Sequence, residues 1–128
     1  MNDGQTDMFE RGKRIRGEVV GREVVEKSLE AADEFTRPIQ ELVTEYCWGA
    51  LWGRTELDRR SRSILNIGML AVLNKPDELA GHIRGAIANG LTKVEIRECL
   101  LQVAVYAGMP AGLSATKIAQ TVLAEFDG

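Results

Sequence analysis

The sequence predicts an all-α fold: a single-domain bundle of about six helices. Apolar residues recur three and four positions apart along most of the chain, and no segment shows the period-two alternation of a strand. Signals that begin and end helices separate these segments. With 128 residues, 45% of them hydrophobic and 27% charged, the chain can bury its own core. We expect residues 1–8 to form a flexible N-terminus and residues 9–128 to form the helical domain.

The first half of the chain is expected to contain three helices. The first two are predicted at Phe9–Val20 and Glu23–Phe35. The buried side of the second would carry Val24, Val25, Leu29 and Ala32. A third begins near Pro38, because proline suits the first turn of a helix. Its predicted buried residues are Ile39, Leu42, Val43, Tyr46 and Ala50.

A long apolar helix is predicted at Arg59–Leu73, with Asp58 as its N-cap. Its second half, Ile64–Leu73, is apolar on every side and is interrupted by Asn66. A helix of this kind is expected to be enclosed, either within one chain or between subunits.

Capping signals divide the rest of the chain into three more helices. Pro76 opens the first, and Gly90 closes it with a left-handed cap. The Thr-Lys-Val-Glu segment at 92–95 forms a capping box, and that helix ends at Gly108. Its predicted apolar face consists of Ile96, Leu100, Val103, Ala104 and Ala107. Pro110 starts the last helix, whose predicted apolar face consists of Leu113, Ile118, Val122 and Phe126.

Composition narrows the classes of function. The net charge of −3 argues against a nucleic-acid surface, which needs a basic field. The longest apolar run is too short to cross a bilayer, and no signal peptide is visible, so we expect a cytoplasmic protein with no membrane partner. Cys47 and Cys99 form no metal-ligand pattern, and there is no phosphate-binding loop, so neither a metal nor another cofactor is expected.

His82, the single histidine, is a candidate catalytic residue. It lies three residues after Leu79 and four before Ala86, so it should point near the core. An imidazole changes its charge near neutral pH, which suits proton transfer. Glu78, one turn earlier, could hold the ring or share its proton. The alternative is a structural histidine bonded to a carbonyl group.

A second candidate cluster contains Glu45, Trp48 and Trp52, at positions i, i+3 and i+7 of one helix. Gly49 and Gly53 lie beside it, and glycine within a helix suggests the close approach of another helix or of a ligand. Two tryptophans on one stripe also suit a core or a subunit contact.

Three further residues complete the candidate site. Arg62 lies in the first turn of its helix, where a cation opposes the macrodipole and needs a specific partner. That partner is either a protein carboxylate or a substrate carboxylate. Arg54 is a second possible anion contact. Tyr106 is either a core ring or a hydroxyl group on a pocket rim.

These residues, in this order, resemble the carboxymuconolactone decarboxylase family. The resemblance covers roughly Gly21 to Ala115. The segments that carry it are Thr44–Arg54, Leu57–Ser63, Glu78–Ala86, Asn89–Glu98 and Tyr106–Ala111. After Pro110 and Ala111, the segment Gly112–Ala115 is less polar than is expected for many members.

The resemblance implies an alkylhydroperoxidase-D-like fold in a homohexamer, a trimer of dimers. It implies cofactor-independent decarboxylation of 4-carboxymuconolactone, a small anionic lactone, to an enol-lactone in the β-ketoadipate pathway of aromatic compound catabolism. His82 would be a hydrogen-bond donor or proton source, and Glu45 or Glu78 would tune it or relay its proton. Arg62 and Arg54 would anchor the carboxylate that stays. The site would be walled by Trp48, Trp52 and Tyr106.

Two other functions are considered. One is a non-catalytic or small-acid-binding helical oligomer of the same fold. The other is a peroxide-linked reductase, whose active helix resembles Cys-x-x-Cys-x-x-x-His. Counting back from His82, the two cysteine positions hold Lys75 and Glu78, so the sequence excludes a thiol mechanism through that motif.

Overall fold

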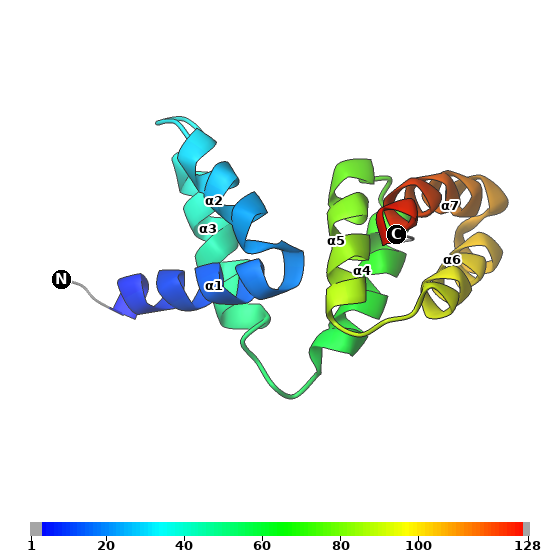
Figure 1. The fold of residues 1–128 in the computed structure, drawn as a ribbon, viewed down its shortest axis with the longest axis horizontal. Helices are drawn as coiled ribbons and strands as arrows, with labels where there is room; N and C mark the ends of the chain where they lie inside the picture. Colours follow the sequence, from blue (N-terminus) through cyan, green and yellow to red (C-terminus); the bar gives the residue numbers. More distant parts are fainter. Residues whose placement is uncertain (1–3, 127–128) are drawn as a thin grey trace. The chain divides into compact units, whose positions relative to one another are not determined.

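The computed structural model describes residues 4–126, with side chains from Asp7 onward, and within this range every regular element is a helix. The predicted all-α fold is therefore confirmed. The chain divides into two compact units, one ending at Leu57 and the other beginning at Asp58 (Figure 1). The single domain expected over residues 9–128 stays a prediction. No helix among the described residues is long and apolar enough to cross a membrane.

The first unit contains three α-helices and a π-helix. They are α1 (Gly4–Val20), α2 (Arg22–Ala31), α3 (Arg37–Leu42) and η1 (Val43–Leu51). Helix α1 begins five residues before the predicted Phe9, and residues 1–3 lie outside the described part. Figure 1 shows α2 and α3 side by side above α1.

The second helix ends earlier than predicted because Asp33 organises a turn. Its carboxylate accepts hydrogen bonds from the backbone N–H groups of Phe35 and Thr36, both at 2.9 Å. These bonds satisfy the backbone without a helix. They also lower the pKa of Asp33, chiefly through Thr36. Phe35, predicted to lie in the helix, is 90% exposed in this turn.

The buried side of α3 and η1 is the tryptophan stripe, and not the apolar face expected from Pro38 onward. Ile39, Leu42 and Tyr46, expected in the core, are all more than half exposed. Trp48 and Trp52 are buried instead, with stacked rings whose centroids lie 4.8 Å apart. Helix α1 packs on this stripe, so the tryptophans take the core alternative that the sequence left open. The buried core of this unit consists of Ile15, Val19, Trp48 and Trp52.

Glycines allow α1 to pack closely on η1. A Cβ on Gly12 would collide with the backbone carbonyl oxygen of Thr44 and would lie 2.9 Å from the backbone nitrogen of Gly49. A Cβ on Gly49 would lie 2.8 Å from the carbonyl oxygen of Met8. Arg11 adds a hydrogen bond of 2.7 Å to the carbonyl oxygen of Gly53. The close approach predicted from Gly49 and Gly53 is thus made by another helix.

The substitution Gly12→Ala is expected to destabilise the first unit. The added methyl group meets backbone, which cannot rotate away, so overpacking should lower the free energy of unfolding by about 1–3 kcal/mol. Gly17→Ala on the same helix is the matched control, because its Cβ would find its nearest atom at an ordinary 3.4 Å. Urea unfolding followed by circular dichroism measures both. Equal stabilities for the two variants would contradict the close packing.

The second unit contains four α-helices and a final 3₁₀ turn. They are α4 (Arg59–Val72), α5 (Pro76–Ala88), α6 (Lys93–Ala107), α7 (Met109–Leu123) and η2 (Ala124–Phe126). The predicted caps are confirmed. Asp58 accepts a hydrogen bond from the Ser61 backbone N–H at 2.6 Å, and Thr92 and Glu95 form the reciprocal capping box. Gly90 and Gly108 have positive φ angles, of 98° and 116°.

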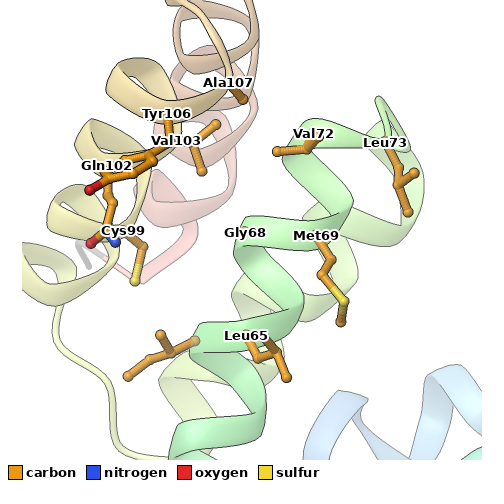
Figure 2. A pocket seen from close by; sticks show the side chains of 11 residues that line it. Leu65, Gly68, Met69, Val72, Leu73, Cys99, Gln102, Val103, Tyr106 and Ala107 are labelled. Carbon is orange, nitrogen blue, oxygen red and sulfur yellow. The ribbon is translucent and has the colours of Figure 1, made fainter.

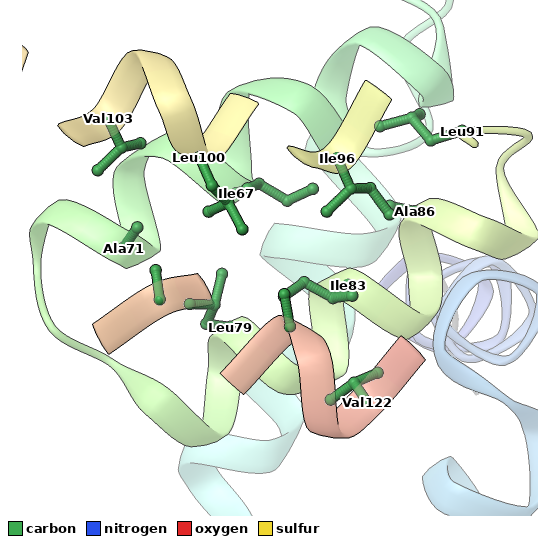
Figure 3. Close-up of a cluster of buried hydrophobic side chains, with 12 residues drawn as sticks. Ile67, Ala71, Leu79, Ile83, Ala86, Leu91, Ile96, Leu100, Val103 and Val122 are labelled. Carbon is green, nitrogen blue, oxygen red and sulfur yellow. The ribbon is translucent and has the colours of Figure 1, made fainter. Parts of the chain in front are cut away.

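The core of this unit lies where all four α-helices meet (Figure 3). Ile67 of α4, Ile83 of α5 and Ile96 of α6 are fully buried in it. The predicted face of α7 is partly confirmed, because Val122 is buried and Ile118 packs against the core. Leu113 and Phe126 are exposed, and the buried residues of α7 are Gly112, Ala115, Ala119 and Val122. Small residues let α7 pack closely on α6, since a Cβ on Gly112 would collide with Ala104.

Helix α4 is only partly enclosed within the chain. Ile67 and Ala71 are the buried members of its apolar run, whereas Leu65 and Val72 are each 54% exposed. The alternative that one chain encloses Ile64–Leu73 is therefore wrong, because α5, α6 and α7 cover only one side of the helix. Its other apolar side faces away from the core of the unit.

Candidate active site

His82 lies half-buried on α5 and faces a polar residue of α4. The Nδ2 atom of Asn66 is 3.4 Å from the Nδ1 atom of the imidazole. Helices α4 and α5 pack directly against each other, so both backbones hold the contact. The sequence predicted the inward position of His82 but identified Asn66 only as a break in an apolar run. A polar residue inside such a run was the available signal for a buried partner.

Burial sets the charge of His82. Desolvation lowers the pKa of the ring from its ordinary value of 6.5, and the negative charge of Glu78 partly opposes this shift. The native ring is therefore neutral at pH 7. Above pH 6.5 the neutral ring contributes fully to the free energy of unfolding. This contribution is lost as pH falls from 6.5 through the lowered pKa of the native ring, because the unfolded chain takes up the proton first.

Glu78 is exposed on α5 and acts on His82 through its charge. The substitution Glu78→Gln is expected to lower the pKa of His82 further, because it removes the charge that favours the imidazolium. An NMR titration measures this without ambiguity, since the chain has one histidine. Asp77→Asn removes a neighbouring carboxylate of the same helix and should leave the pKa of His82 unchanged. A shift of equal size in both variants would contradict the assigned interaction.

Arg62 lies in the first turn of α4, four residues before Asn66 and hence on the same side of the helix. Its Nε atom is buried and has no hydrogen-bond partner among the described residues. A buried N–H group without an acceptor costs about 1–3 kcal/mol. The arrangement leaves a guanidinium donor available for a carboxylate beside the Asn66–His82 contact.

A second amide, Asn89 at the C-cap of α5, also contacts α4. Asn89 donates from Nδ2 to the Ser63 hydroxyl group at 2.9 Å. Ser63 is fully buried, so this contact satisfies a hydroxyl group in the core. Asn89 therefore has a structural role, and its substitution can serve as a control for substitutions of Asn66.

Four of the predicted site residues belong to the first unit. Trp48 and Trp52 are 4% and 3% exposed and pack with α1, which fits the core alternative for two tryptophans on one stripe. Glu45 is half-buried on η1. Arg54 is exposed after η1 and lies 3.7 Å from the Glu56 carboxylate. Their roles in a site stay predictions.

Tyr106 lines an apolar groove between α4 and α6 (Figure 2). The groove has a volume of about 630 Å³, and its lining includes Leu65, Met69 and Val103 but not His82 or Asn66. The tyrosine ring is 85% exposed, so it is not a core ring. The pocket rim on which Tyr106 lies is the rim of this groove.

Both thiols lie in surroundings that keep them protonated. Burial raises the pKa of Cys47, and a nearby Arg16 partly opposes the shift. Burial and the charge of Glu95 raise the pKa of Cys99. A reactive cysteine needs the opposite shift, toward the thiolate. Within residues 4–126, no three His, Cys, Asp or Glu side chains are grouped so as to hold a metal ion.

Comparison with known sequences shows which class of protein has this helical chain and its single histidine. The chain belongs to the carboxymuconolactone decarboxylase family, whose sequence profile matches residues 37–121. A nitrosuccinic acid decarboxylase of Metarhizium robertsii is 45% identical over 91% of this chain and 81% of its own. A 4-carboxymuconolactone decarboxylase of Acinetobacter baylyi is 38% identical over 95% of this chain and 90% of its own. The predicted family and the predicted class of enzyme, a carboxy-lyase, are confirmed.

Proposed function

We propose that this protein decarboxylates 4-carboxymuconolactone, or a related carboxylated lactone, to an enol-lactone. The observation that carries the proposal is the buried, unpartnered Nε of Arg62, one helical turn from the Asn66–His82 contact. This arrangement combines a cation for a carboxylate with an imidazole for a proton or a hydrogen bond. The similarity to the Acinetobacter enzyme supports the choice of substrate.

The reaction places three demands on the protein. The bond between the ring carbon and the departing carboxylate breaks, CO2 leaves, and the electron pair spreads through the ring double bond onto the lactone carbonyl. A ring carbon then takes up a proton. The protein must provide a poorly solvated place for the departing carboxylate, a donor to the developing oxyanion and an acid for the ring.

His82 is proposed as the hydrogen-bond donor or proton source, with Glu78 tuning it or relaying its proton. Arg62 is proposed to anchor the carboxylate that stays. No cofactor is needed, because the substrate itself accepts the electron pair.

A second candidate substrate is nitrosuccinic acid, favoured by the 45% identity to the Metarhizium enzyme. Its nitro group would accept the electron pair of the broken bond, and its other carboxylate would stay. It therefore places the same demands on His82 and Arg62 as the lactone does.

Turnover of the two acids by the purified protein tests these functions. Release of CO2 is measured for both substrates, and loss of the lactone is also followed in the ultraviolet. A higher kcat/KM for the lactone supports the first proposal, and a higher value for nitrosuccinic acid replaces it with the second. Turnover of neither acid would contradict both and favour the small-acid-binding alternative.

We also propose that the protein is cytoplasmic and self-associates, as a hexamer built from dimers. The exposed apolar side of α4 and the groove beside Tyr106 support self-association, because a second copy would cover them. Light scattering after size exclusion is expected to give a mass several times 14.1 kDa at micromolar concentration. The substitution Val72→Glu should lower that mass. A fully active wild-type monomer would contradict the proposal.

A further inference from the structure

The contact between Asn66 and His82 brings two nitrogen atoms together. The amide nitrogen Nδ2 of Asn66 faces the ring nitrogen Nδ1 at 3.4 Å. An amide nitrogen has two N–H groups to donate, so Nδ1 must be the acceptor in this contact. A neutral imidazole carries one N–H group. When Nδ1 accepts, the proton of the ring therefore lies on Nε2.

We propose that Asn66 is a positioning residue that holds neutral His82 as the Nε2–H tautomer. In this form Nε2 of the ring is a hydrogen-bond donor and not a base. What that donor does rests on the proposed function: it would bond to the lactone carbonyl or nitro oxygen as negative charge develops there. The tautomer itself is a property of the protein without substrate.

Three features of the surroundings fit this role. Asn66 and His82 are both half-buried between packed helices, where an unmade hydrogen bond is costly. Ile67 and Ile83, the next residues along α4 and α5, are fully buried and fix the two backbones. Burial also keeps the ring in the neutral state, in which a choice of tautomer exists.

The tautomer can be read directly from the full-length ¹⁵N-labelled protein. A two-bond ¹H–¹⁵N correlation distinguishes a protonated Nε2 from a protonated Nδ1, and the single histidine gives one set of signals. The spectrum is recorded at a pH where the ring is neutral. The wild-type protein should show the Nε2–H pattern. An Nδ1–H pattern in the wild-type protein would overturn the proposal, whatever the variants do.

Two variants of Asn66 and one control test its role. Asn66→Asp replaces the donor with a carboxylate that can only accept, so the Nδ1–H pattern should appear. Asn66→Ala removes the amide donor, and the single pattern should be lost. Asn89→Ala removes the other amide of this interface and should keep the wild-type pattern. Unchanged tautomers in both Asn66 variants would overturn the assignment.

Kinetics add a second readout that is linked to function. Asn66→Ala should lower kcat about 10-fold or more and leave KM within about twofold, because the lost donor orientation matters most in the transition state. Asn89→Ala should leave both constants nearly unchanged. If the wild-type protein has the Nε2–H tautomer but turns over neither acid, the proposed function fails and the role of Asn66 stands.

Discussion

The substitutions His82→Ala and His82→Gln are expected to lower kcat by about 10²–10⁴-fold, the usual contribution of a positioned proton donor or acceptor. His82 is the single histidine of the chain and is half-buried against Asn66. The helical circular dichroism spectrum and the melting temperature should barely move, since the ring is outside the apolar core of α4–α7. Steady-state kinetics and thermal unfolding measure the two effects.

The two replacements at His82 also separate two roles. A glutamine amide can donate a hydrogen bond but cannot transfer a proton at neutral pH. If His82 acts as a hydrogen-bond donor, the Gln variant should retain more activity than the Ala variant. If His82 transfers a proton, the two variants should be equally impaired. Retention of at least half of the wild-type activity by both variants would make His82 structural and the mechanism wrong.

The second large effect is expected at Arg62. Replacing this residue by methionine keeps much of the side-chain volume but removes the charge and the buried, unpartnered Nε–H group. We expect kcat/KM to fall about 10- to 100-fold, the value of a hydrogen bond to a charged group. The free energy of unfolding should stay equal or rise, because an unsatisfied donor is removed. Loss of function with a gain of stability is the signature of a residue kept for its ligand.

The control for Arg62 lies in the same helical turn. Arg60 is exposed and is paired with the Glu95 carboxylate, so Arg60→Met should change kcat/KM less than twofold. Its effect on stability should also be small, since exposed ion pairs contribute about 0–1 kcal/mol. Unchanged kcat/KM in Arg62→Met would show that Arg62 does not bind the carboxylate that stays.

The sequence by itself determined the class of fold and most helix boundaries of the second unit. These features depend on local chemistry. Asp58 caps α4 through its own side chain, Thr92 and Glu95 cap α6 reciprocally, and Gly90 and Gly108 adopt positive φ angles. Each of these signals acts over a few residues, so a single sequence contains it. The order of the sequence blocks was also enough to indicate the family.

Tertiary structure alone decided which apolar face of the first unit is buried and which residues of different helices meet. At η1 the packing of α1 buries Trp48 and Trp52 and leaves Tyr46 exposed, so the neighbouring helix decides which side belongs to the core. Asn66, which contacts His82, lies 16 residues away on another helix. Such a contact depends on how α4 and α5 pack, and the spacing of residues along one helix contains no information about it.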